Sequence, residues 1–153
     1  MGRMILCVLL VVIIILGSAL AEDYYILCRP GSQVNIRKRP ASGSPVVGSV
    51  EFGRVVHADG PEKNGYVHIT DLAAEITEGW ISAGYLVEEE PRIEKYKAEV
   101  WGGPVVARSR IGGKAIKTLR DGKTVTVYAK TNRWAVTNRG YIMCDWLRPV
   151  EED

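Results

Sequence analysis

Residue types that commonly carry catalysis are few in this chain of 153 residues. Its two histidines, His57 and His68, lie in alternating apolar runs that predict strands, and an acidic residue follows each within three positions. A zinc site needs three or four converging ligands, so the pattern favours hydrogen-bonded strand histidines over a metal site. The sequence shows no serine elbow, Gly-rich phosphate loop or recognisable carboxylate pair. We therefore expect no catalytic residue, no metal and no cofactor.

The chemistry of binding is better represented, because basic and aromatic residues interleave in the C-terminal half. Residues 22–90 hold six Lys or Arg against eleven Asp or Glu, a balance of −5, whereas residues 91–153 hold thirteen against seven, a balance of +6. Tryptophans can stack on sugars while guanidinium groups bind anions. The alternatives left open are an ordinary solvated surface and, for Arg37 and Arg108, a structural role in binding loop carbonyls.

Residues 1–21 resemble an export signal rather than part of the fold. Arg3 precedes an uninterrupted apolar run over residues 4–16, and Ala19 and Ala21 give the small-x-small pattern of a cleavage site. The run is shorter than the roughly 20 apolar residues of a membrane span. We expect cleavage after Ala21 and a secreted or cell-wall-associated protein. An uncleaved N-terminal anchor is the alternative.

Cleavage would remove Cys7 and leave two cysteines, Cys28 and Cys144. Export permits a disulfide between them, which would join the two halves of the chain, but two cysteines are no disulfide framework. Small buried free cysteines are common. Whether the two thiols pair therefore stays open.

The remaining chain contains a repeat. At an offset of 71 residues Tyr25, Val34, Arg37 and Arg39 align with Tyr96, Val105, Arg108 and Arg110. After a loop two residues shorter, an offset of 69 aligns Val47, Val50 and Gly53 with Ile116, Leu119 and Gly122. Later Tyr66 matches Trp134, and an offset of 61 aligns Trp80 and Tyr85 with Tyr141 and Trp146. The sequence therefore predicts two copies of one module.

Each copy is predicted to form five short strands. In the first, residues 34–53 indicate a strand, a loop rich in Pro, Ser and Gly, and a second strand. In the second, strands are expected at 104–107, 115–119, 124–128, 134–137 and 141–147, with turns at 121–122 and 138–140. An insert at 70–78 lengthens one hairpin of the first copy or forms a helical turn.

These residues resemble a known family. VNIRKRPASGSPVVGSVEFGRVV, followed by an aromatic-initiated strand and GWISAGYL, is similar to the bacterial SH3-like (SH3b) domain, a small partly open β-barrel found in many exported proteins. The resemblance covers residues 33–86 well. The second copy departs from it, since Val106 replaces Asn35, Tyr141 replaces Trp80 and Trp146 replaces Tyr85.

The resemblance implies an all-β chain with two SH3-like barrels in tandem. We expect a signal peptide at 1–21, domains at 22–87 and 95–150, a linker at 88–94 and an acidic tail at 151–153. Large residues must close such thin cores, so Trp80, Tyr85, Tyr141 and Trp146 are predicted to plug the barrels. The predicted ligand-binding residues are Tyr25, Asn35, Arg37, Arg39, Tyr66, Trp101, Arg108, Arg110 and Trp134.

The expected function is non-catalytic binding of a cell-envelope ligand, either peptidoglycan stem peptides or an anionic wall polymer. Nucleic acid is not expected as a partner, because the chain is exported. One alternative is an adaptor or inhibitor of a secreted protein. A second is a cell-wall hydrolase, because Cys28 precedes both histidines as in cysteine peptidases of bacterial walls. Against it, Arg29-Pro30-Gly31 follows Cys28 and does not open a helix.

Overall fold

The computed structural model describes residues 22–70 and 78–151. The predicted signal peptide or anchor, most of the predicted insert at 70–78 and the last two residues of the predicted tail lie outside these ranges. No helix within the described residues has the length and apolar character needed to cross a membrane.

The first module comprises residues 22–87 and contains a seven-stranded antiparallel sheet. Its strands are β1 (Glu22–Ile26), β2 (Gln33–Arg37), β3 (Val46–Glu51), β4 (Val55–Lys63), β5 (Tyr66–Thr70), β6 (Glu78–Ser82) and β7 (Leu86–Val87). They are hydrogen-bonded in the order β3-β2-β6-β5-β4-β1-β7. A 3₁₀ turn, η1 (Ala83–Tyr85), joins β6 to β7.

The second module comprises residues 92–149 and repeats this topology. Its strands are β8 (Arg92–Val100), β9 (Val105–Arg108), β10 (Ala115–Leu119), β11 (Thr124–Lys130), β12 (Trp134–Thr137), β13 (Gly140–Met143) and β14 (Leu147–Pro149). The order β10-β9-β13-β12-β11-β8-β14 matches the first module strand for strand, and η2 (Cys144–Trp146) corresponds to η1. The all-β, two-module fold predicted from the sequence is confirmed, and within the described residues each sheet has seven strands where five per copy were predicted.

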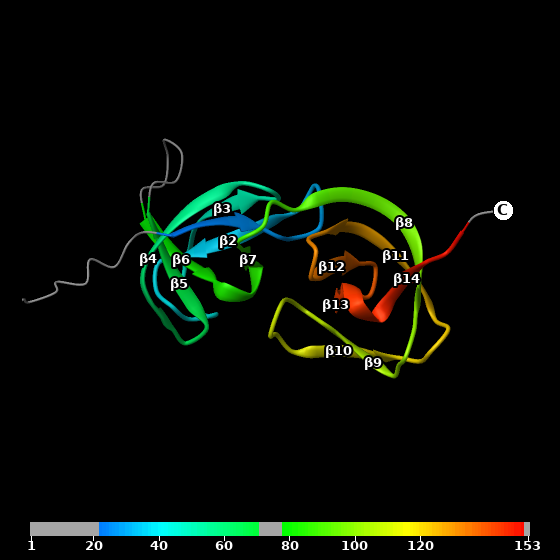
Figure 1. The fold of residues 1–153 in the computed structure, drawn as a ribbon. Helices are drawn as coiled ribbons and strands as arrows, with labels where there is room; N and C mark the ends of the chain where they lie inside the picture. The colour runs from blue at the N-terminus through cyan, green and yellow to red at the C-terminus, as the bar shows by residue number, and fades with distance from the viewer. Residues whose placement is uncertain (1–21, 71–77, 152–153) are drawn as a thin grey trace, which may run out of the picture.

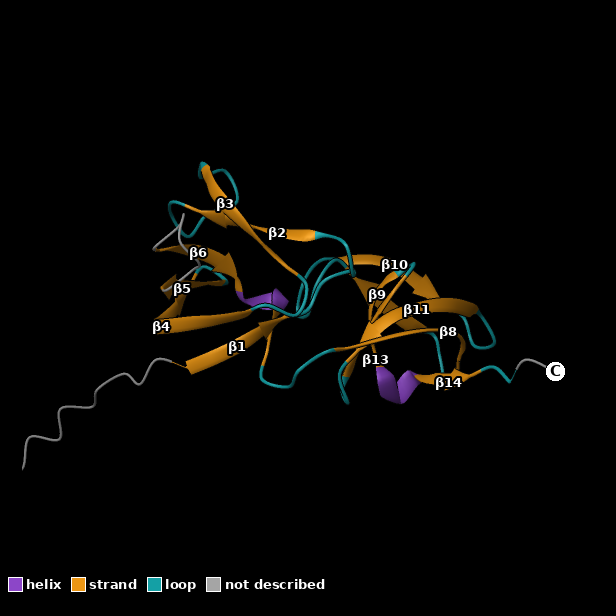
Figure 2. Ribbon diagram, turned by 90° about the horizontal axis from the view of Figure 1, so that it is seen from above, coloured by secondary structure: helices purple, strands orange, loops and turns teal. Residues whose placement is uncertain are grey.

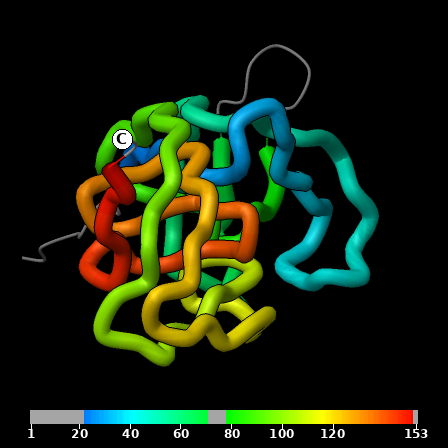
Figure 3. Tube along the Cα trace, turned by 90° about the vertical axis from the view of Figure 1, so that its right-hand side faces the viewer, coloured from blue at the N-terminus to red at the C-terminus, as the bar shows by residue number. Residues whose placement is uncertain are grey.

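The two modules lie side by side, with β8 arching over the second (Figure 1). Seen from above, the strands of each module surround their own interior (Figure 2). A view along the line joining the modules shows the β2–β3 hairpin, blue to cyan, extending to one side past the second module (Figure 3).

Local turn chemistry places the hairpins where the sequence predicts them. The loop between β2 and β3 occupies residues 38–45, inside the predicted strand-loop-strand of 34–53. Gly122 has a φ of 78°, which only glycine adopts without strain, and it closes the β10–β11 turn. β12 and β13 are joined by Asn138 and Arg139, as Thr137 pairs with Gly140.

Two expectations need correction. The repeat alignment placed Tyr25 on Tyr96. In the structure Tyr25 pairs with Val55, and the residue equivalent to Val55 in the second module, Thr124, pairs with Glu99. Tyr25 therefore corresponds to Glu99.

The charged run before β8 was also expected to disfavour packing, yet Pro91 is buried. The Glu89 carboxylate accepts hydrogen bonds from the backbone N–H of Asn132 at 2.9 Å and from Arg92 at 3.4 Å. These hydrogen bonds connect the segment to the second module, and β8 begins at Arg92, inside the predicted linker.

Each sheet curls around a separate apolar core. The first contains Ile26, Cys28, Val34, Ile36, Val50, Val56, Ala58, Ile69 and Ile81. The second contains Ala98, Val100, Val105, Ala107, Leu119, Val125, Val127, Ala135 and Ile142. Apolar burial of this kind is the dominant stabilising contribution in small domains.

A third buried cluster joins the modules. Leu27 of the first module packs against Val136 and Tyr141 of the second, and all three are buried. The Tyr141 hydroxyl donates a 2.7 Å hydrogen bond to the Leu27 carbonyl, and burial raises the pKa of this phenol. Nearby, the Arg29 guanidinium lies 4.3 Å from the centre of the Tyr128 ring. The modules therefore share an interface with its own apolar centre.

Candidate functional site

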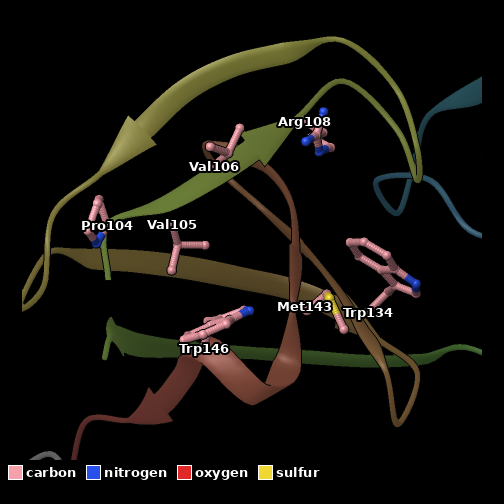
Figure 4. A pocket seen from close by; sticks show the side chains of 7 residues that line it. All are labelled: Pro104, Val105, Val106, Arg108, Trp134, Met143 and Trp146. Carbon is pink, nitrogen blue, oxygen red and sulfur yellow. The ribbon is translucent and has the colours of Figure 1, made fainter. Parts of the chain in front are cut away.

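Each module carries a groove on its surface. The first groove is lined by Gln33, Val34, Asn35, Arg37, Ser42, Tyr66, Ser82, Tyr85 and Arg110. The second groove is lined by Pro104, Val105, Val106, Arg108, Trp134, Met143 and Trp146 (Figure 4). Their volumes of ≈ 270 and ≈ 200 Å³ lie below the roughly 300 Å³ at which enclosed small-molecule sites begin, so these open grooves suit part of an extended ligand.

The two grooves occupy the same positions of the repeat. Arg37 pairs with Trp80 across β2 and β6, and Arg108 pairs with Tyr141 across β9 and β13. On the facing strands, Tyr66 opposes Ser82 just as Trp134 opposes Met143. Each lining residue of the second groove therefore has a counterpart in the first.

The grooves differ in polarity. Gln33, Asn35 and Ser82 of the first are replaced in the second by Pro104, Val106 and Met143. Figure 4 shows Met143 beside Trp134, with Trp146 on the other side of the groove and Val105 above it. Trp146 is 41% exposed, so an apolar ligand would cover much of its indole ring. The first groove thus offers hydrogen bonds, and the second offers mainly apolar and aromatic contact.

Arg37 and Arg108 each hold the loop that follows their strand. Arg37 donates from Nη1 to the Ser44 carbonyl at 2.8 Å, and Arg108 donates from Nη1 to the Gly113 carbonyl at 3.0 Å. The structural role that the sequence left open is therefore present in both modules. Because a guanidinium carries five N–H donors, each arginine retains donors for a ligand in the groove.

The predicted binding residues divide into two groups. The first groove brings together Asn35, Arg37, Tyr66 and Arg110, and the second brings together Arg108 and Trp134. Tyr25, Arg39 and Trp101 line neither groove. Tyr25 is half-buried in β1, Arg39 is exposed in the β2–β3 loop, and the Trp101 ring lies 3.1 Å from the Arg148 guanidinium carbon.

None of the four aromatic residues predicted to plug the barrels is buried within a barrel core, and of the four only Tyr85 packs against one. Tyr85 and Trp146, which lie in the 3₁₀ turns η1 and η2, line the grooves, and Tyr85 also packs against the first core. Tyr141 is buried, but between the modules. Trp80 is partly exposed, and its ring packs at a tilt against that of His68, with ring centres 5.1 Å apart. The alignment of Tyr85 with Trp146 in the repeat is the sequence feature that could have predicted that both residues line a groove.

Both histidines lie in strands and contact aspartates. His57 Nδ1 contacts the Asp23 carboxylate, and His68 Nδ1 lies 2.6 Å from Asp59 Oδ1. His68 Nε2 is also 3.8 Å from Glu78. No group of three or more His, Cys, Asp or Glu side chains within residues 22–70 and 78–151 is arranged to hold a metal ion.

The two cysteines are free thiols in the described structure. Cys28 is buried, and its Sγ lies 3.6 Å from the Arg29 carbonyl and 3.5 Å from the Ser32 carbonyl. Burial raises the pKa of Cys28 to about 11. Burial likewise raises the pKa of Cys144, whose Sγ donates to the Thr131 carbonyl at 3.5 Å. An uncharged thiol is a poor nucleophile, so the surroundings of Cys28 do not activate it.

Comparison with known proteins gives one family match. Residues 32–87 match the model of the bacterial SH3 domain. No curated protein matches the chain. Among solved structures, it is similar to NlpC1 from Trichomonas vaginalis, with 19% identity and a TM-score of 0.37 over 86% of this chain and 47% of that one. It is also similar to NlpC2 from the same organism, with 21% identity and a TM-score of 0.37 over 85% and 48%. The chain spans about half the length of these proteins.

Proposed function

We propose that this chain, whose residues 32–87 form a bacterial SH3 domain, binds the peptide part of a cell-envelope polymer through its two grooves. The observation that carries the proposal is the recurrence of one groove at equivalent positions of both modules, each lined by an equivalent arginine and two aromatic residues. Two equivalent grooves in one chain favour a repeating ligand, because the second binding event becomes intramolecular.

The lining of the grooves supports a peptide. Amide, hydroxyl and guanidinium groups in the first groove match backbone carbonyls and carboxylates, and the apolar second groove matches small aliphatic side chains. In this proposal the chain acts outside the cell after cleavage at Ala21 and performs binding without catalysis. Catalysis by Cys28 receives no support, because its thiol is buried and its pKa is raised.

A second candidate is an adaptor or inhibitor that binds a secreted protein. The apolar second groove favours it, since exposed Trp146 faces Trp134 and Met143 across the groove, and aromatic residues and Met are enriched in protein interfaces. The two candidates differ in their dependence on wall material.

Co-sedimentation of residues 22–153 with purified peptidoglycan sacculi at low salt tests the proposal. We expect the wild-type chain to pellet, Tyr66→Ala and Trp134→Ala each to weaken binding, and the double variant to stay in the supernatant. Trp101→Ala is the matched control, because this exposed tryptophan lies outside both grooves. A wild-type chain that does not sediment would overturn the proposal. A protein partner recovered by cross-linking without wall material would then favour the second candidate.

A further inference from the structure

One residue of the first groove belongs to the second module. Arg110 lies in the loop between β9 and β10, yet it lines the groove formed by β2, β5 and β6 of the first module. We propose that the second module completes this groove, and that Arg110 and Arg37 together bind a carboxylate of the ligand. This inference rests on the proposed function, and it identifies a carboxylate as the chemical group of the ligand that the first groove recognises.

Close contact between two backbones positions Arg110. The Ile111 N–H donates to the Gly84 carbonyl at 3.1 Å, which ties the β9–β10 loop to η1 of the first module. A Cβ at Gly84 would lie 2.4 Å from the Ile111 carbonyl oxygen and 2.8 and 2.9 Å from Cγ and Cδ of Arg110. The aliphatic stem of Arg110 therefore packs directly over Gly84, and only a residue without a side chain fits there.

The loop is also fixed within its own module. The backbone N–H of Gly113 donates a hydrogen bond to the Arg110 carbonyl at 2.9 Å, and the backbone N–H of Ser109 donates one to the Lys114 carbonyl at 2.9 Å. Arg108 binds the Gly113 carbonyl, so the second module's arginine braces the loop that presents Arg110. A guanidinium held in this way loses less conformational entropy on binding than one on a mobile loop.

Arg110 has unused binding capacity. Arg110 is half-buried as a residue, and its guanidinium makes no hydrogen bond or ion pair with any residue of the described part of the chain. Among residues 22–70 and 78–151 no acidic side chain lines the groove, whereas Arg37 and Arg110 both do. Two positive charges on a surface without acidic neighbours favour an anion.

Ser82 gives an independent sign of a missing partner. It lines the same groove and is only 8% exposed, and its Oγ is buried without a hydrogen-bond partner among the described residues. A buried hydroxyl without a partner costs free energy, so such groups are uncommon unless a ligand or water satisfies them. The groove therefore combines two guanidinium groups with an unsatisfied hydroxyl.

A carboxylate fits these donors. The planar fork of arginine binds carboxylates through paired N–H groups, and these charge-assisted bonds are stronger than bonds between neutral groups. Phosphate shares this chemistry, but the proposed peptide ligand supplies carboxylates. The inference commits to a peptide carboxylate, and the experiment separates it from phosphate.

Calorimetric titration of residues 22–153 with a soluble stem peptide tests the inference. The probe is the peptide with free carboxylates, and its comparison is the same peptide with all carboxylates converted to carboxamides. We expect Arg110→Gln to weaken binding of the free peptide about tenfold or more, and to leave binding of the carboxamide peptide unchanged. Arg110→Lys should give an intermediate loss, because it keeps the charge but not the fork.

Lys114→Gln is the matched control, since it removes one positive charge from the same loop outside the groove and should change neither affinity. If wild type and Arg110→Gln bind the free peptide equally, the inference is wrong even though the proposed function stands. If poly(glycerol phosphate) displaces the bound stem peptide at a lower concentration than an excess of the same peptide with free carboxylates does, the assignment to carboxylate is wrong. A wild-type chain that binds neither walls nor peptide would instead overturn the proposed function itself.

Discussion

The hydroxyl of Tyr141 in the second module donates a hydrogen bond to the carbonyl of Leu27 in the first, 2.7 Å away. Both residues are buried, and the Tyr85 ring meets Tyr141 edge-on with ring centres 6.3 Å apart. Tyr85 in turn lines the first groove. The contact between the modules and the first groove thus share a residue, so the packing of the modules bears directly on the shape of that groove.

Tyr141→Phe should destabilise the chain by about 1–3 kcal/mol, because it leaves the buried Leu27 carbonyl without a partner. The ring itself is retained, so the apolar packing against Leu27 and Val136 should persist. Urea unfolding followed by tryptophan fluorescence measures this change, and the slope of the transition should be unaltered.

Tyr128→Phe is the matched control for that measurement. Tyr128 also lies near the contact between the modules, where the Arg29 guanidinium stacks on its ring. Its hydroxyl makes no hydrogen bond with any of the described residues. We expect a change within about 0.5 kcal/mol. Equal effects of the two substitutions would show that the Tyr141 hydroxyl contributes nothing particular to the interface.

Gly84→Ala should reduce binding at the first groove while every charge is retained. The added Cβ would meet the Ile111 carbonyl oxygen at 2.4 Å, so the β9–β10 loop must move and displace Arg110. We expect an affinity loss for a carboxylate-bearing peptide similar to that of Arg110→Gln, about tenfold, measured by the same titration.

Gly43→Ala serves as the control, because a Cβ there meets nothing within 4 Å. Its affinity should equal that of the wild-type chain. Undiminished binding by a folded Gly84→Ala variant would mean that Arg110 reaches the groove without the close contact at Gly84.

Much of the fold follows from local sequence signals. Alternation of apolar residues predicts strands such as 124–128, and the turn residues at 121–122 and 138–140 place the hairpins. β8 escaped prediction because outward Ile93 is apolar while inward Glu94 is charged, and because its fully buried positions, Ala98 and Val100, come only near its end. Period-two alternation is present there, but the preceding acidic run resembles a linker.

The site was predictable only in part, for a physical reason. Arg37 and Arg108 were identified because they recur at equivalent repeat positions. Tyr66 and Trp134 were identified because they lie near strand ends, where the resemblance to SH3-like domains places the binding groove. Tyr85 and Trp146 were assigned to the core because large aromatic residues usually bury, but the 3₁₀ turns that carry them leave them at the groove wall. The role of Arg110 depends on how two modules pack, which no pattern within one module encodes.

Arg108→Met should loosen the β9–β10 loop, because the Gly113 carbonyl loses its 3.0 Å hydrogen bond to the guanidinium. We expect faster amide hydrogen exchange at Gly113 and a loss of about 1 kcal/mol in stability. Since that loop carries Arg110, peptide affinity at the first groove should also fall by a few fold. Arg37→Met is the comparison in the first module, where it should loosen the 38–45 loop and leave exchange at Gly113 unchanged. Protection at Gly113 that survives Arg108→Met would contradict the bracing role.

Cys28 should resist alkylation in the folded chain. Its pKa is raised to about 11 by burial, so at pH 8 its thiolate fraction, and with it the rate with iodoacetamide, should be about a hundredfold below that of the same cysteine in urea. Mass spectrometry of the Cys28 and Cys144 peptides follows the two thiols separately.

The same pKa fixes how stability depends on pH. Because the folded pKa lies above the unfolded value near 9.0, the buried neutral thiol contributes stability that is complete below about pH 9 and declines as the pH rises toward about 11. Cys28→Ser should remove this alkaline decline, and sedimentation with walls should be unaffected, since Cys28 lines neither groove. Rapid alkylation at neutral pH, or wall lysis that disappears in Cys28→Ser, would instead favour a cysteine hydrolase.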